Sequence, residues 1–136
     1  MPSEHIGMPV DEIDTPVLLV DLDDLEYNIN MLATHFAQAG KHLRPHTKSH
    51  KTPAIAHLQL QAGAIGVTCA KLGEAEVMAN AGIDDILIAN QVVGRFKIPR
   101  LMELARRCNI MAAVDHPDNL ADLDSAAGSA GVRPRL

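Results

Sequence analysis

Short apolar runs alternate along the chain with longer segments in which apolar residues recur at helical spacing. The runs predict buried strands, and the longer segments predict amphipathic helices. Leu25 and Phe36, for example, bound a helical face that Asp21 or Asp23 can cap and that Gly40 can end. The strands are expected at Val17–Val20, His42–Thr47, Ile65–Cys69, Ile86–Ala89, Ile110–Val114 and from Val132 to Leu136.

A predicted helix follows each of these strands except the last. The later helices are expected from Thr52 to Gly63, from Gly73 to Ala81, around Ile98, Leu101 and Ala105, and after Pro117, where Leu120 and Leu123 should face the core. Successive strands begin about 21 to 25 residues apart, which is typical of strand–helix units. Because strands joined by helices run parallel, the pattern predicts an α/β fold with a parallel sheet.

Two architectures contain such units: the doubly wound open sheet and the TIM-type (β/α)8 barrel. The open sheet carries a glycine-rich turn after its first strand, whereas residues 19–28, LVDLDDLEYN, contain no glycine, which favours the barrel. A barrel needs eight units and about 250 residues. We therefore expect a truncated barrel, with residues 1–13 as a lead and residues 14–136 as the first part of the barrel. A complete flavodoxin-like domain of five strands is the alternative.

Composition and charge narrow the choice of partners. The formal net charge is -5, and neither a long basic run nor an aromatic platform is present, which argues against a nucleic-acid surface and favours a small-molecule ligand. No apolar run approaches the roughly 20 residues that cross a bilayer, and the first 14 residues do not resemble a signal peptide. Cys69 and Cys108 lack the spacing of a disulfide framework, so we expect reduced thiols in a cytoplasmic protein.

The stretch with the most candidate chemistry is residues 41–51, KHLRPHTKSHK. Side chains alternate along a strand, so Arg44, His46 and Lys48 should share one side, which in a barrel is the interior. Lys48 would lie at the carboxyl end of the strand, where barrel enzymes place their catalytic groups. Neighbouring cations and partial burial favour an unprotonated amine, which is the form that makes Schiff bases.

Two other interpretations of this stretch remain open. A run of charged residues is often simply a solvated basic loop. Alternatively, His42, His46 and His50 are spaced by four and would align on a helix as metal ligands. Pro45 argues against that helix, because proline lacks an N–H donor and biases the residue before it away from helical geometry.

Polar residues also follow the next three predicted strands. They are Thr68 and Lys71, Asn90 and Gln91, and Asp115 and His116. In a barrel they would lie at the same face as Lys48. Each residue taken alone also fits a helix cap or a turn, and His116 before Pro117 fits one especially well.

Three segments together resemble a known family. They are DTPVLLVDLDDLEYNI (14–29), LRPHTKSHKTP (43–53) and GAIGVTCAKLGEAEVMANAGIDDILIANQVVG (63–94). This combination resembles the D-threonine aldolase and D-serine dehydratase family among the alanine-racemase-like, fold type III pyridoxal phosphate enzymes. The R-P-H-x-K-x-H-K string is its most specific part, although Ser49 stands where the family more often has threonine.

The resemblance implies a fold, a cofactor and a reaction. It implies a barrel like the alanine racemase N-terminal domain and a lyase that acts on D-3-hydroxy amino acids by aldol cleavage or dehydration. Lys48 would carry pyridoxal 5'-phosphate as a Schiff base. The cofactor-binding residues would be Lys48, Arg44, His46, His50, Thr68 and Gln91. A racemase of the same barrel type, or a carrier protein that binds pyridoxal phosphate without turnover, are the alternatives.

The resemblance also places important parts outside this chain. The phosphate-binding residues would lie on later barrel strands, and a divalent metal would be bound in a β-rich C-terminal domain. The strand at Val17–Val20 would pair with that domain rather than join the barrel. The family resemblance further implies a homodimer, and the chain by itself is expected to be inactive.

Overall fold

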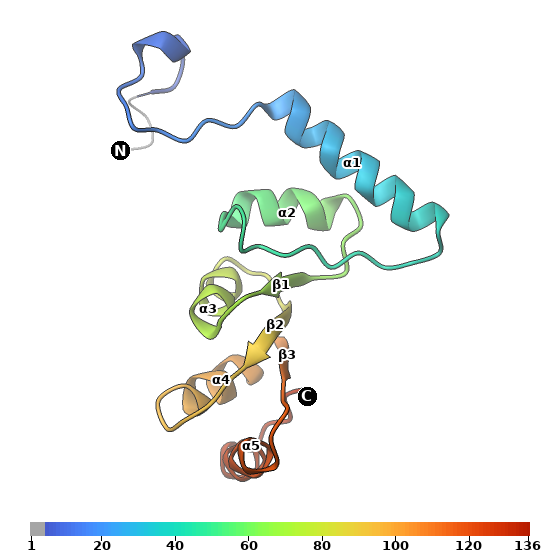
Figure 1. Ribbon diagram of the computed structural model, residues 1–136, viewed down its shortest axis with the longest axis vertical. Helices are drawn as coiled ribbons and strands as arrows, with labels where there is room; N and C mark the ends of the chain where they lie inside the picture. The colour runs from blue at the N-terminus through green and yellow to red at the C-terminus, as the bar shows by residue number, and fades with distance from the viewer. Residues whose placement is uncertain (1–4) are drawn as a thin grey trace.

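The computed structural model describes residues 5–136, and a parallel sheet lies at its centre. Its strands, in the order β1-β2-β3, are β1 (Val67–Cys69), β2 (Asp85–Gln91) and β3 (Asn109–Ala113). The helices are α1 (Leu22–Gln38), α2 (Pro53–Gln61), α3 (Leu72–Asn80), α4 (Ile98–Ala105) and α5 (Pro117–Ala130), and a 3-10 turn, η1, spans Val10–Glu12. Strands and helices therefore alternate as the sequence predicts, and Figure 1 shows them stacked from α1 to α5.

The predicted strand at 42–47 is an extended segment beside β1, which we call the 42–47 segment. His46 forms a single parallel bridge with Thr68. The N–H of Thr68 donates to the carbonyl oxygen of Pro45 at 2.8 Å, and the N–H of Thr47 donates to that of Thr68 at 2.8 Å. Since Pro45 has no N–H to donate, the ladder is interrupted and no regular strand is formed.

The predicted strand at Val132 appears only as the start of a pairing. Arg135 bridges Met111 in parallel, and its N–H donates to the carbonyl oxygen of Ile110 at 3.0 Å. The sheet thus has five consecutive parallel positions: the 42–47 segment, the three strands and Arg135. A helix separates each position from the next, which confirms the α/β fold and the parallel sheet and fits the first part of a barrel.

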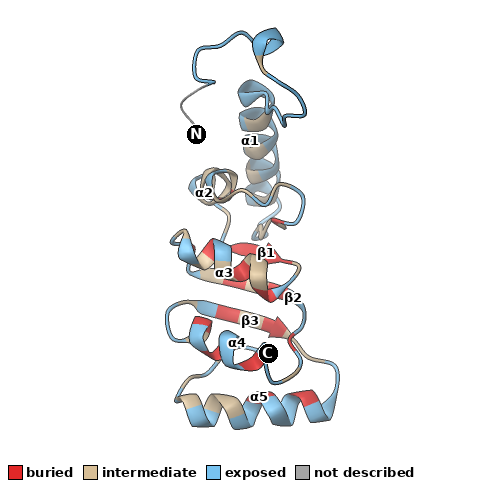
Figure 2. Cartoon of the chain, turned by 90° about the vertical axis from the view of Figure 1, so that its left-hand side faces the viewer, coloured by how far each residue is buried: buried red, intermediate tan, exposed pale blue. Residues whose placement is uncertain are grey.

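The two faces of the sheet have different environments. Val67, Ile86 and Ile110 are aligned across the three strands and are at most 2% exposed. They belong to the core under α3 and α4, and Figure 2 shows the buried residues gathered on the strands and on the helices that cover them. The opposite face carries Thr68 and Leu87. In a closed barrel this face would be the interior.

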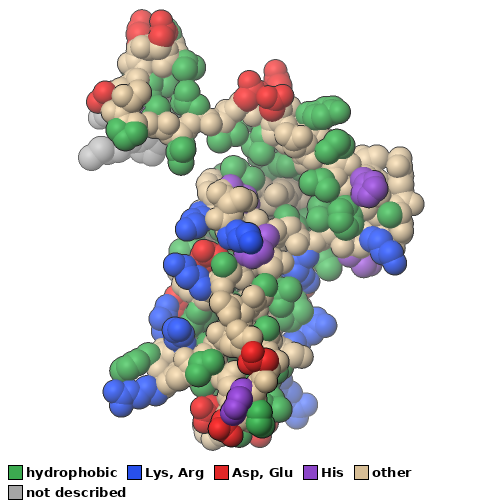
Figure 3. Space-filling view, viewed as in Figure 1, with side chains coloured by type: hydrophobic (Ala, Val, Ile, Leu, Met, Phe, Trp, Pro, Cys, Tyr) green, Lys and Arg blue, Asp and Glu red, His purple; other side chains and the backbone are tan. Residues whose placement is uncertain are grey.

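Helix α1 begins and ends where the sequence predicts. The carboxylate of Asp21 accepts a hydrogen bond from the N–H of Asp24 at 3.1 Å, and Gly40 has the left-handed φ of 62° that ends the helix. Helix α1 packs on α2, and none of its residues is buried. Figure 3 shows hydrophobic side chains on the surface over this helix. The exposed ones in and before α1 include Val17, Leu18, Leu19, Val20, Leu22, Tyr27, Met31 and Leu32.

Two details differ from the prediction. Val17–Val20 form no strand within residues 5–136, and Leu18 is 97% exposed. The pairing of this run with a further domain, which the family resemblance implies, stays a prediction. Leu120 does not face the core: it is 46% exposed, whereas Leu123 is 1% exposed. Helix α5 directs Asn119 and Leu123 inward, four residues apart, and Leu120 falls beside that stripe.

Some smaller predictions concern the chain ends, the thiols and membranes. Residues 1–4 of the predicted lead lie outside the described residues. Cys69 and Cys108 are free thiols, and burial raises the pKa of both. Within residues 5–136, no helix is both long and apolar enough to cross a membrane.

Candidate functional site

Lys48 lies in the turn that directly follows the 42–47 segment, and its side chain is exposed. The N–H of Lys51 closes this turn by donating to the carbonyl oxygen of Thr47 at 2.8 Å. Thr47 itself is fully buried, and its hydroxyl donates to the carbonyl oxygen of Thr68 at 3.2 Å. The turn therefore starts from a well-anchored residue, and Lys48 stands at the carboxyl end of the parallel sheet.

His46 is half-buried and lies in register with Thr68. Its Nδ1 accepts a hydrogen bond from the backbone N–H of Lys48 at 3.2 Å. An imidazole that accepts at Nδ1 carries its proton at Nε2 when it is neutral. The same hydrogen bond links the orientation of His46 to the position of Lys48, two residues further on.

His50 is held at the start of α2. Its Nδ1 accepts from the N–H of Thr52 at 3.1 Å, and the hydroxyl of Thr52 donates to the carbonyl oxygen of His50 at 2.7 Å. Burial lowers the pKa of His50 below its ordinary value. A neutral His50 therefore anchors the connection between Lys48 and α2.

Thr68 lies on β1 with its side chain on the open face of the sheet, and it is 8% exposed. Its hydroxyl donates to the carbonyl oxygen of Arg44 at 3.3 Å.

Next along the sheet, a bulge in β2 brings Gln91 into register with Ala113 of β3. The side-chain amide of Gln91 donates to Asp115 Oδ2 at 2.8 Å. Asp115 thus joins the polar residues at the carboxyl ends of the strands.

Arg44 differs from the other predicted site residues in its placement. Its Nη1 donates to Asp85 Oδ1 at 2.6 Å and to the carbonyl oxygen of Asp85 at 3.3 Å. Asp85 is the first residue of β2, so the guanidinium lies at the amino ends of the strands. The structure therefore brings Lys48, His46, Thr68 and Gln91 to the sheet positions expected of them, but it places the Arg44 side chain at the opposite end.

Asp85, Asn109 and Gly66 were not among the residues that the sequence singled out. Asn109 donates through Nδ2 to Asp85 Oδ2 at 2.9 Å, and Gly66 is buried under the Arg44 side chain. Once His46 is paired with Thr68, counting back two residues on each side puts Arg44 beside Gly66. The sequence does not show, however, which residue of β2 lies opposite Gly66.

The other predictions about this region concern metals and helix ends. Among residues 5–136, no three His, Cys, Asp or Glu side chains come together as metal ligands. His42, His46 and His50 lie on no common helix. His116 caps α5, because its Nδ1 accepts from the N–H of Asp118 at 3.2 Å. Lys71 is the residue that precedes α3, where its side chain lines a cavity with Lys51.

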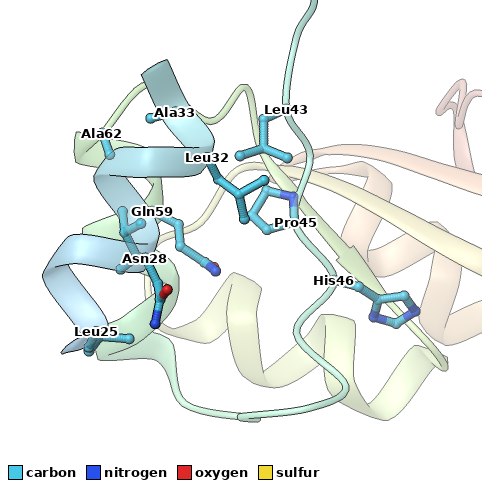
Figure 4. Close-up of a pocket in the computed structure, with 10 residues that line it drawn as sticks. Leu25, Asn28, Leu32, Ala33, Leu43, Pro45, His46, Gln59 and Ala62 are labelled. Carbon is cyan, nitrogen blue, oxygen red and sulfur yellow. The ribbon is translucent and has the colours of Figure 1, made fainter. Parts of the chain in front are cut away.

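A cavity of about 330 Å³ lies between α1, α2 and the 42–47 segment. Figure 4 shows Leu32 of α1 beside Leu43 and Pro45, with Gln59 of α2 on the other wall and the imidazole of His46 pointing away from α1. The lining is mainly apolar, so it suits packing side chains better than a charged ligand. We therefore place the candidate site at the carboxyl ends of the strands.

Alternating helices and parallel strands, with polar side chains at the strands' carboxyl ends, define the first part of an α/β barrel. The model of the family "Alanine racemase, N-terminal domain" matches residues 20–136. The chain belongs to this family, and the expected fold is confirmed.

Known proteins are similar over nearly all of the chain. It is 40% identical over 132 residues to the D-threonine aldolase of Arthrobacter sp., covering 97% of this chain and 35% of that protein. The crystal structure of D-threonine aldolase from Filomicrobium marinum matches with a TM-score of 0.90 and 46% identity, over 92% of this chain and 34% of that one. D-threo-3-hydroxyaspartate dehydratase from Delftia sp. HT23 matches with a TM-score of 0.82 and 32% identity, over 90% and 32%. The chain thus spans about a third of each relative's length.

Proposed function

We propose that this chain is the first part of the barrel of a pyridoxal-phosphate-dependent lyase that acts on D-3-hydroxy amino acids, and that Lys48 holds the cofactor covalently. The observation that carries this proposal is the position of Lys48, in the turn at the carboxyl end of the 42–47 segment and hydrogen-bonded through its backbone to His46. The likeness to proteins named as an aldolase and a dehydratase supports the reaction class.

The residues at this end of the sheet fit such a cofactor. An exposed primary amine is the group that condenses with an aldehyde, and Lys48 provides one. When bound, pyridoxal phosphate supplies an electron-withdrawing ring that stabilises negative charge at the substrate Cα. Breaking the Cα–Cβ bond would give glycine and an aldehyde, and losing the hydroxyl would give a dehydrated product.

We assign supporting roles to the other polar residues at this end of the sheet. His46 has its Nδ1 occupied by the Lys48 N–H, so we assign its Nε2–H as a donor toward the open face of the sheet. The pairing of Gln91 with Asp115 holds a second polar group at the same ends of the strands. We assign Thr68 to the pocket floor, between His46 and β2.

The metal ligands, the rest of the polypeptide, the oligomeric state and the location in the cell are also proposals. The described residues do not fit a divalent metal site, so we place the ligands of the metal that the family resemblance implies elsewhere in a longer polypeptide and use no metal in any step. The relatives' greater length supports a further part of the barrel and a second domain. We propose a homodimer, in keeping with the exposed apolar side chains before and along α1, and a cytoplasmic location, in keeping with two free thiols.

The test uses the full-length polypeptide that contains residues 1–136. The protein is loaded with pyridoxal phosphate and reduced with borohydride, and the labelled peptide is identified by mass spectrometry. We expect the label on Lys48 alone. D-Threonine is then supplied, and glycine, acetaldehyde and 2-oxobutanoate are measured. Label on Lys41, Lys51 or Lys71 would overturn the assignment of Lys48, and racemised substrate without either product would overturn the lyase.

A further inference from the structure

The 42–47 segment leads directly into Lys48 but has weak backbone support. Among the described residues its only bridge is to Thr68 of β1, and Pro45 has no N–H to donate. A segment with few ladder hydrogen bonds frays more easily than a fully paired strand. A side-chain attachment would therefore add to the backbone pairing that keeps the segment, and the lysine that follows it, in place.

The Arg44 side chain provides a second attachment, which passes over β1 and ends on β2. Its Nη1 contacts Asp85 twice, at a carboxylate oxygen and at the carbonyl oxygen. Asn109 of β3 donates to the other carboxylate oxygen of Asp85. The side chains of Arg44 and Asp85 are only 17% and 31% exposed, so the pair is shielded from water on most sides. The three residues span four parallel positions of the sheet.

Gly66 makes this crossing possible. A Cβ atom at Gly66 would lie 2.2 Å from Arg44 Nη1 and 2.4 Å from the carbonyl oxygen of Asp85. Any side chain at this position, directly before β1, would occupy the space through which the guanidinium reaches β2. A glycine next to a strand often marks the close approach of another group to its backbone.

We infer that Arg44 is a positioning residue: its ion pair with Asp85 fixes the register of the 42–47 segment on the sheet, and so holds Lys48 at the carboxyl end. When a parallel strand slips by two residues, each side chain stays on the same face of the sheet but moves by about 6.6 Å along it. The Arg44–Asp85 ion pair can form in only one such register. Because covalent cofactor chemistry depends on sub-ångström placement, loss of the pair weakens the cofactor site from the far end of the strand. This inference rests on the proposed role of Lys48.

The test compares four variants of the full-length polypeptide: Arg44→Met, Asp85→Asn, the double variant and Arg106→Met. Arg106 is the matched control, since its ion pair with Glu103 is exposed and lies at the C-terminal end of α4. Two properties are measured: amide hydrogen exchange at Thr47 and Thr68 in the cofactor-free protein, and the dissociation constant of pyridoxal phosphate from its visible absorbance.

We expect Arg44→Met and Asp85→Asn each to accelerate exchange at these two amides and to weaken pyridoxal phosphate binding by about tenfold. The double variant should bind pyridoxal phosphate as tightly as the single variant with the lower affinity. Arg44→Lys, which keeps the charge but loses the forked donor geometry, should fall between wild type and Arg44→Met. Arg106→Met should match the wild type in both measurements.

Three results would overturn the inference. If Arg44 touched the cofactor directly, Arg44→Met would weaken binding while Asp85→Asn and the two amides stayed at wild-type values. If the pair only stabilised the fold as a whole, exchange at the α5 amides would accelerate as much as at Thr47 and Thr68. Additive losses in the double variant would show that the two residues act separately. The exchange measurement needs no cofactor, so it still tests Arg44 if Lys48 proves not to hold pyridoxal phosphate.

Discussion

Gly66→Ala is the substitution whose effect follows most directly from the geometry. The added Cβ would meet the Asp85 carbonyl oxygen at 2.4 Å, and this oxygen belongs to the backbone of the neighbouring strand. The Arg44 guanidinium, 2.2 Å from the same position, would also have to leave its carboxylate. Overpacking of a well-packed interior costs about 1–3 kcal/mol, and the φ of +154° adds strain for any residue with a side chain. We expect a loss of about 2–3 kcal/mol of unfolding free energy.

Gly128→Ala is the control for this prediction. Gly128 lies in α5, is exposed, and has no atom within 4 Å of an added Cβ. Alanine in a helix is more stable than glycine by about 0.5–1 kcal/mol, so this variant should be slightly stabilised. Both variants are compared with wild type by denaturant unfolding of the full-length, cofactor-free protein. If Gly66→Ala unfolded at the wild-type denaturant concentration, the close approach of Arg44 and Asp85 around Gly66 would be wrong.

Three further predictions concern the cofactor, a metal and pH. Lys48→Ala should abolish both the visible absorbance of bound pyridoxal phosphate and turnover, whereas Lys51→Ala, whose side chain lines a cavity with Lys71 and Glu74, should keep the absorbance; equal losses would refute the assignment. Exhaustive treatment with a chelator should abolish activity toward D-3-hydroxy amino acids, and full activity without metal would favour a racemase. Since burial lowers the pKa of His50, this residue's contribution to stability is present above its ordinary value of 6.5 and is lost as the pH falls below it. His50→Gln should therefore flatten the pH dependence of the thermal midpoint between about pH 7 and 5, and an unchanged slope would contradict the shift.

Much of the fold and part of the candidate site were readable from the sequence. Helix boundaries depend on local signals, such as the cap at Asp21 and the left-handed glycine at position 40, and these act within a few residues. The short apolar runs predicted the parallel strands because both faces of such a sheet are covered in a barrel. The sequence likewise predicted the position of Lys48 directly after an extended segment, whereas the shared side expected for Lys48 stays a prediction because Lys48 lies in a turn.

The sequence by itself determined which segments are helices and which are extended, the family to which the chain belongs, and the lysine at a strand's carboxyl end. Only the tertiary structure decided what Arg44 contacts, because an ion pair that crosses a strand depends on the register of three sheet positions at once. It also decided that Val17–Val20 pair with no other described segment, because an extended apolar run becomes a strand only when another segment satisfies its backbone hydrogen bonds. Periodicity is a property of one segment, whereas register and pairing are relations between segments distant in the sequence.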